Sequence, residues 1–180
     1  MKTAKRTLVC LLLLAEMLPF YCLQAQELTH VKGIHAIGVR GGIGTKNKYD
    51  VGLTYNYHFN TNIALCVEAD HEKAQFGHSE FTSILLLSPG IDYSPINPWN
   101  WSYLTLNLSA SVGYDRWTCS EIHEKKSGIV YGANAGISWE VIPWHFLSFV
   151  IKAQEYILFG NNDQYLKPLF SLGIRYNFHK

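Results

Sequence analysis

The chain has 180 residues, enough for one domain, and its 15 Lys and Arg against 14 Asp and Glu give a formal net charge of +1. This balance leaves no basic excess to neutralise phosphates, which argues against direct nucleic acid binding. Aromatic residues make up 14% of the chain, an apolar content that excludes disorder over most of its length, and after residue 20 no apolar run approaches the roughly 20 residues of a membrane-spanning helix.

The amino terminus has the layout of a secretory signal peptide, with a basic start, an apolar centre and a small residue, Ala25, before Gln26. A short membrane anchor is the alternative. Glu16 argues against an anchor, because a carboxylate is costly inside a bilayer. We therefore expect residues 1–25 to be a signal peptide and residues 26–180 to form a single domain.

The dominant pattern in the remaining sequence is a large apolar residue at every second position. In the second segment, for example, Tyr49, Val51 and Leu53 alternate with Asp50 and Gly52. Because side chains alternate between the two faces of a strand, this period predicts strands with one apolar and one polar face. Eight such segments occur, at about 34–43, 49–59, 62–70, 81–93, 104–115, 129–140, 147–154 and 170–178.

Two architectures fit eight alternating strands, a soluble barrel or sandwich and an outer-membrane barrel. The polar faces are rich in Gly, Ser, Thr and Asn, which suits a narrow lumen. Several strands end in aromatic residues, as at membrane interfaces. Connections at 58–61, 95–100 and 142–145 are compact, whereas those at 72–80 and 118–127 are longer and polar. We therefore predict an eight-stranded antiparallel up-and-down barrel of the outer-membrane type, which would contact outer-membrane lipid.

The same alternation predicts which side chains enter the lumen. An eight-stranded barrel has an interior just wide enough for side chains, so opposite charges there should pair and fill it. A proton path or a catalytic site is the alternative. Glu155 falls on the lipid-facing side, which places it near the interface or implies a bulge that turns it inward. The inward-facing charged residues are Arg40, Glu68, Asp92, Asp115, Glu140, Lys152 and Arg175.

The final segment has a polar residue, a glycine and two aromatic residues at fixed offsets, namely Ser171, Gly173, Tyr176 and Phe178. This pattern resembles the carboxy-terminal assembly signal of bacterial outer-membrane barrels. The resemblance implies recognition by the barrel-insertion machinery.

Motifs for enzymatic chemistry are absent, and we predict no catalytic, cofactor or metal site. The glycine-rich stretch 38–46 lacks the Gly-Lys-Ser/Thr order of a phosphate-binding loop. His71 and His78 lie in a polar connection without diagnostic metal-ligand spacing. Cys66 and Cys119 should lie near opposite ends of the barrel, too far apart for a disulfide bond.

Three stretches of the last third, 128–132, 152–160 and 173–178, resemble the TraO family of conjugal transfer proteins from Bacteroidetes conjugative transposons. The length, the signal peptide and the strand count also agree with that family. The resemblance implies a structural or interaction role at the outer membrane, beside other proteins of a conjugative DNA-transfer apparatus. It implies no catalytic residue. The alternatives are a generic small barrel (an anchor, adhesin or minor pore) and a lipid-modifying enzyme, which would require a Ser–His pair near one rim.

Overall fold

The computed structural model describes residues 30–45, 48–76, 80–99, 101–119, 124–160 and 165–178. The predicted signal peptide with its cleavage site at Ala25 and Gln26 lies outside the described residues, as does His78. In the part of the chain that the structure describes, no helix is long and apolar enough to span a membrane.

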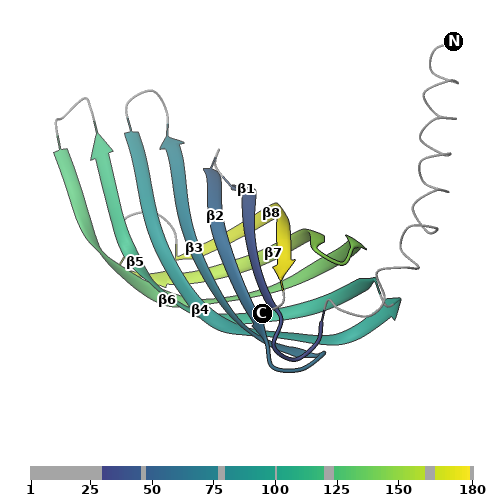
Figure 1. The fold of residues 1–180 in the computed structure, drawn as a ribbon. Coiled ribbons are helices and arrows are strands. Elements are labelled where there is room, and N and C mark those ends of the chain that lie inside the picture. Colours follow the sequence, from purple (N-terminus) through teal and green to yellow (C-terminus); the bar gives the residue numbers. More distant parts are fainter. Residues whose placement is uncertain are drawn as a thin grey trace, which may run out of the picture.

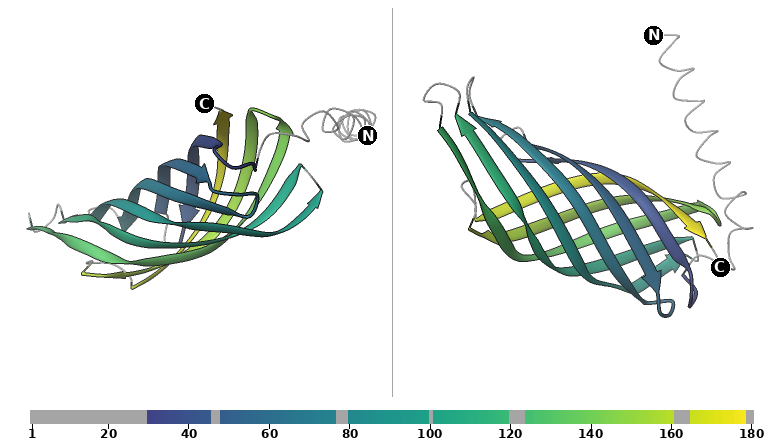
Figure 2. Two further views of the ribbon diagram at one scale, coloured as in Figure 1. Left: turned by 60° about the horizontal axis from the view of Figure 1, so that its bottom comes forward. Right: turned by 60° about the vertical axis from the view of Figure 1, so that its left-hand side comes forward.

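Eight strands follow one another around a closed antiparallel barrel, and β8 pairs with β1 (Figure 1). The predicted fold class is therefore confirmed. Figure 2 shows the steep tilt of the strands, so that those of the front wall cross those of the rear wall. The strands are β1 His35–Gly44, β2 Lys48–His58, β3 Ile63–Phe76, β4 Glu80–Trp99, β5 Ser102–Cys119, β6 Glu124–Trp144, β7 Leu147–Phe159 and β8 Leu166–Phe178.

The apolar side chains point away from the barrel axis. In β1, Val39 lies opposite Leu53 of β2 and Ile174 of β8, and all three are largely exposed. Leu108 of β5 is 66% exposed. The polar residues between them are buried in the lumen. A soluble barrel would have the reverse arrangement, so the exposed apolar face is that of a barrel surrounded by lipid.

Two connections expected as long polar loops are largely strand, and this expectation was wrong. In the segment 72–80, β3 continues to Phe76 and β4 begins at Glu80. In the segment 118–127, β5 continues to Cys119 and β6 begins at Glu124. The antiparallel ladders simply extend through the polar sequence. Both hairpins therefore project beyond the neighbouring strands at one end of the molecule (Figure 1).

The two ends of the barrel differ. The short-turn end carries the compact connections after β2, β4 and β6, together with the start of β1 and the end of β8. The opposite end, where β1, β3, β5 and β7 finish, is called the loop end below. The β4–β5 ladder is irregular at the short-turn end, with register shifts between Tyr93 and Ile96 and between Ile96 and Trp99.

Candidate functional site: the buried charge network of the lumen

The inner face of the barrel is filled with charged side chains. The structure places all seven of the sequence-predicted lumen residues there, each less than a tenth exposed. Among the described residues, they belong to a larger set of five buried basic and seven buried acidic side chains. The additional members are Lys48, Asp50, Asp70, Glu72 and Lys167.

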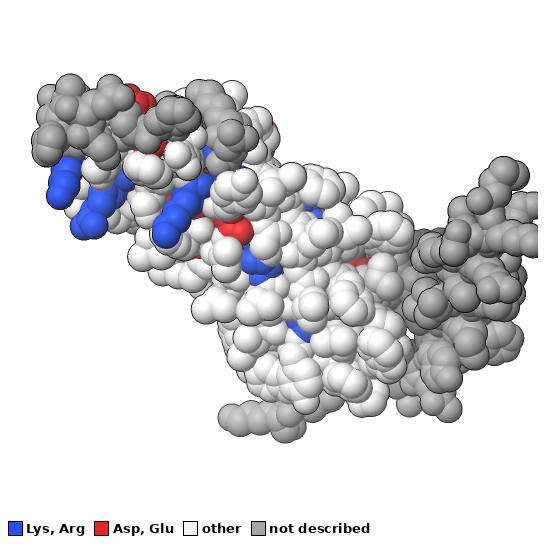
Figure 3. All heavy atoms as spheres, turned by 90° about the horizontal axis from the view of Figure 1, so that it is seen from above, with Lys and Arg blue, Asp and Glu red and all other residues white. Residues whose placement is uncertain are grey.

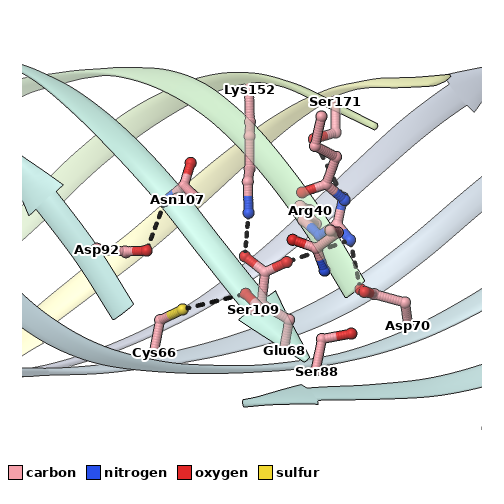
Figure 4. A network of polar contacts seen from close by, with 12 residues as sticks. Arg40, Cys66, Glu68, Asp70, Ser88, Asp92, Asn107, Ser109, Lys152 and Ser171 are labelled. Atoms are coloured by element: carbon pink, nitrogen blue, oxygen red, sulfur yellow. Dashed lines mark hydrogen bonds and ion pairs between the residues drawn. The ribbon is translucent and has the colours of Figure 1, made fainter. Parts of the chain in front are cut away.

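Arg40 is the centre of the network. Its Nη2 atom lies 2.7 Å from Oδ1 of Asp70, and its Nη1 atom lies 3.3 Å from Oδ1 of Asp50. The same guanidinium donates hydrogen bonds to the hydroxyls of Ser171 and Tyr156, each at 3.2 Å. Figure 4 shows Arg40 reaching from β1 toward residues of β3 and β8. One side chain therefore joins strands that lie on different walls of the barrel.

Glu68 and Asp92 extend the network across the lumen. The Nζ atom of Lys152 donates to Oε1 of Glu68 at 2.5 Å, which connects β7 with β3 (Figure 4). Asp92 has no basic partner among the described contacts. Its two carboxylate oxygens instead accept hydrogen bonds from the side-chain amides of Asn56 and Asn107. Amide donors thus satisfy this buried carboxylate.

At the short-turn end, residues just before β1 close the barrel. Arg175 Nη1 lies 3.1 Å from Oε2 of Glu140, and His30 Nε2 lies 3.3 Å from the same oxygen. The His30 ring stacks on Tyr103, with ring centroids 3.7 Å apart. The segment is fixed by a backbone hydrogen bond from Gly33 N to the carbonyl oxygen of His58. The period-two pattern begins only at residue 34, so it gave no signal for His30.

Toward the loop end the lumen contains an apolar layer as well as charges. Lys48 and Lys167 both approach Oε1 of Glu72, at 3.6 and 3.2 Å. The sequence pattern did not reveal these three residues or the buried apolar cluster beside them. The feature that could have revealed the cluster is the change from polar to apolar residues at inward positions of β4 and β7. The cluster consists of Ile84, Leu86, Val130, Tyr156, Leu158 and Leu169.

The charged side chains leave little space beside Arg40. The cavity that lies between Arg40, Lys152 and Arg175 has a volume of about 10 Å³, close to the space one water molecule needs. Among the described residues, no group of three or more His, Cys, Asp or Glu side chains is placed to hold a metal ion. The network can therefore hold the walls together, because Arg40, Lys152 and Arg175 each pair with a carboxylate on another strand.

The residues of the terminal pattern divide between the two faces. Ser171 is buried and accepts a hydrogen bond from Arg40, whereas Tyr176 is exposed on the outer face. Phe178 stacks on His35 of β1, with ring centroids 5.6 Å apart. Gly173 lies opposite Arg40 in the β1–β8 ladder, and its missing side chain leaves room there, since a Cβ atom would lie 3.2 Å from that of Arg40.

Three remaining residues of the sequence analysis lie outside this network. Glu155 is exposed on the outer face of β7 opposite Ala135, and the alternation of β7 is unbroken, so the suggested inward bulge is wrong. Cys66 and Cys119 are both free, as predicted, and the structure places both of them in buried positions.

The Ser–His pair that a lipid-modifying enzyme would require could not be found from the sequence. One is present at the loop end, where His71 Nε2 lies 3.0 Å from Ser83 Oγ. The two residues are 12 positions apart in the chain and meet only because β3 and β4 pair.

Comparison with known proteins gives one family and a group of similar folds. The profile of the family described as conjugative transposon protein TraO matches residues 100–178, which contain β5 to β8. No curated protein matches the sequence significantly.

Solved outer-membrane structures share the fold. The outer membrane protein OprG of Pseudomonas aeruginosa is 12% identical, with a TM-score of 0.60 over 86% of this chain and 100% of that chain. Ail, the attachment invasion locus protein of Yersinia pestis, is 14% identical, with a TM-score of 0.57 over 82% and 100% of the two chains. The N-terminal β-barrel domain of Pseudomonas aeruginosa OprF is 15% identical, with a TM-score of 0.58 over 82% and 98%. At these identities the similarity concerns the fold. The chain therefore matches the TraO family over residues 100–178 on a barrel of the outer-membrane type, which confirms the resemblance that its sequence indicated.

Proposed function

We propose that the protein is an outer-membrane β-barrel component of a conjugative DNA-transfer apparatus, with a structural or interaction role. The match of residues 100–178 to the TraO family carries this proposal. The cavity of about 10 Å³ between Arg40, Lys152 and Arg175 is too small for a solute path, which supports a structural role over a pore. We propose no direct contact with DNA, because 15 basic against 14 acidic residues leave no basic excess to neutralise phosphates.

The proposal includes a route to the membrane. Residues 1–25 would direct export and be cleaved between Ala25 and Gln26. The barrel-insertion machinery would then recognise Ser171, Gly173, Tyr176 and Phe178 on the last strand. Tyr176 is exposed on the lipid-facing side of β8, where a recognition factor can reach it before the barrel closes. The remaining partners are outer-membrane lipid and other proteins of the apparatus.

Cysteine labelling in membranes tests the insertion step. In a variant without native cysteines, single cysteines at Tyr55, Leu106 and Ile174 should react with a probe confined to the lipid phase. Cysteines at Asn56, Asn107 and Arg175, one residue further along the same strands, should not react. A one-residue shift would exchange the two sets, because strand side chains alternate. Equal labelling of both sets would contradict a membrane barrel and favour the soluble alternative.

A mating assay tests the role in conjugation. A donor strain that lacks the protein should lose transfer of its conjugative element, and the wild-type gene supplied in trans should restore transfer. The matched control is the Ala133→Val variant, an outward-facing substitution that should insert normally and restore transfer fully. Normal transfer without the protein would favour the generic small barrel. Transfer restored only by variants with an intact Ser83 would favour the lipid-modifying enzyme.

A further inference from the structure

The outer face of β3 to β6 is apolar over most of its height and becomes basic at the loop end. Figure 3 shows Lys and Arg side chains gathered at the end where the β3–β4 and β5–β6 hairpins project. Four exposed basic residues point outward there, namely His71, Lys73, Arg116 and Lys125. The described outward-facing residues of β3 to β6 include no carboxylate. We call these four residues, together with Ser83, the rim cluster.

The pairing of the strands brings the rim cluster together. Lys73 of β3 lies opposite Ser83 of β4, and Ser83 lies opposite Arg116 of β5. Since neighbouring strands are about 4.8 Å apart, the Lys73 and Arg116 backbones stand roughly 10 Å from each other with Ser83 between them. Both long side chains can therefore reach a single anionic group above Ser83. Lys125 of β6 pairs with Thr118, two residues beyond Arg116, so it adds a third cation at the edge.

A hollow on the barrel surface adjoins these cations. Its volume is about 390 Å³, and it is lined by His71, Ser83, Leu85, Tyr114 and Arg116. Directly toward the membrane centre lies a second hollow of about 260 Å³, which shares Leu85 and Tyr114 with the first. The second hollow is otherwise lined by apolar side chains and by the backbone of Gly113. A cationic hollow continuous with an apolar one fits a molecule with an anionic head and a hydrocarbon tail.

The rim cluster also lies at the depth expected for contact with lipid headgroups. The ladder row of Ile63, Tyr93 and Leu106 stands at the short-turn end, and the row of Lys73, Ser83 and Arg116 lies ten residues further along the same strands. At about 3.4 Å per residue and a tilt near 40–45°, ten residues span roughly 25 Å, the height of the apolar band of outer-membrane barrels. The cations therefore stand at the lipid headgroups when the row of Tyr93 stands at the opposite interface.

We propose that the rim cluster binds the phosphate group of an anionic lipid in the leaflet at the loop end, with an acyl chain lying against Leu85 and Tyr114. This inference rests on the proposed insertion in the membrane. Lys73 and Arg116 supply charge-assisted hydrogen bonds, and His71 orients the Ser83 hydroxyl. A DNA backbone or an acidic protein fits less well, because the cationic hollow opens into a lipid-facing apolar one.

The same geometry argues for binding over hydrolysis. A general-base histidine is usually oriented by a carboxylate, and the described outward residues of these four strands provide none. Cations around a hydroxyl suit an anionic ligand instead.

The test measures binding of a synthetic lipid A bearing phosphate monoesters to the purified full-length barrel by native mass spectrometry. The dephosphorylated lipid is the ligand control. The double variant Lys73→Gln/Arg116→Gln should bind about 30-fold more weakly, roughly fivefold for each basic residue at an anionic lipid surface. The matched control Lys32→Gln/Lys126→Gln removes the same charge elsewhere, since Lys32 precedes β1 and Lys126 lies on the opposite face of β6 over the Trp117 ring. Its affinity should remain within about twofold, because neither residue belongs to the cluster.

Four results would overturn the inference. They are an equal loss in both double variants, equal binding of the dephosphorylated lipid, full displacement by inorganic phosphate, and loss of an acyl chain from the bound lipid. The last result would indicate a hydrolase centred on Ser83. Insertion is followed separately by the heat-dependent gel mobility of the folded barrel. An inserted barrel that ignores the lipid therefore contradicts this inference alone, whereas a barrel that does not insert contradicts the proposed function.

Discussion

The inner and outer faces of this barrel are made by the same eight strands, yet they follow opposite rules. Val39 is 56% exposed on the outer face, and the next residue, Arg40, is buried among three carboxylates in the lumen. On the outer face, apolar size matters and exact shape matters little, because lipid chains adapt to it. On the inner face every side chain meets fixed neighbours from other strands. The comparison teaches that added volume is restricted inside and tolerated outside, whereas a charge needs a partner inside and is costly in lipid outside.

The largest expected effect comes from adding volume to one face. Gly132 and Ala133 are neighbours in β6, and a Cβ atom at Gly132 would lie only 1.9 Å from the backbone oxygen of Ile157. Gly132→Val should abolish the folded barrel, because the clash involves backbone and exceeds the roughly 1–3 kcal/mol of ordinary overpacking. Ala133→Val, which projects into lipid, should fold normally. Heat-dependent gel mobility measures the folded fraction, and equal yields would contradict the difference between the faces.

A second comparison removes a charge on the inner face, at Arg40, and keeps an apolar side chain on the outer face, at Val39. Arg40→Met should lower the free energy of unfolding by about 3–5 kcal/mol, because Asp50, Glu68 and Asp70 then lose a shared buried cation. Val39→Met on the outer face should change it by less than about 1 kcal/mol, since the side chain remains in lipid. Urea unfolding in lipid vesicles, followed by tryptophan fluorescence, gives both values. A stabilised Arg40→Met protein would show that the network is dispensable.

The third prediction separates assembly from stability on the last strand. Phe178→Ser should sharply reduce the outer-membrane yield, because it removes about 1.5–3 kcal/mol of apolar burial and an aromatic position of the terminal signal. Phe170→Ser removes the same side chain from the lipid face of β8, outside the four residues of the signal, and should reduce the yield less. Arg175→Gln should insert, although Glu140 then loses its partner at 3.1 Å and the inserted barrel becomes less stable. Fractionation of the cells ranks the three variants, and a lower yield for Arg175→Gln than for Phe178→Ser would contradict the assembly signal.

The smallest effect is expected at the two cysteines. Both are free, and the Sγ atom of Cys66 lies 4.0 Å from the hydroxyl of Ser109 in the lumen. Cys66→Ser/Cys119→Ser should therefore insert as well as the wild type, with a change in unfolding free energy below about 1 kcal/mol. Mass spectrometry of the non-reduced protein should find no peptide that links the two. A linked peptide would require a different strand order.

The sequence was most informative where a rule of period two applied. Alternation predicted the eight strands, the lipid-facing side of each, and the inward direction of Arg40 and Lys152. It could not reveal that Arg40 reaches Asp70 and Tyr156, because β3 and β7 do not pair with β1 and meet its side chain only across the lumen of the closed barrel. It also assigned the ends of β3 and β5 to loops, since polar residues in a projecting hairpin have the composition of a loop.

The amino-acid sequence by itself determined the fold class, because a two-residue period fixes which face of each strand is apolar. It also determined the family resemblance, through stretches in β6, β7 and β8. Only the tertiary structure decided which charges meet, that His30 closes the short-turn end, and that His71, Lys73 and Arg116 surround Ser83. The physical reason is the register of the ladders. These contacts depend on which residues of different segments stand opposite one another, and a period along one strand holds no information about its neighbour.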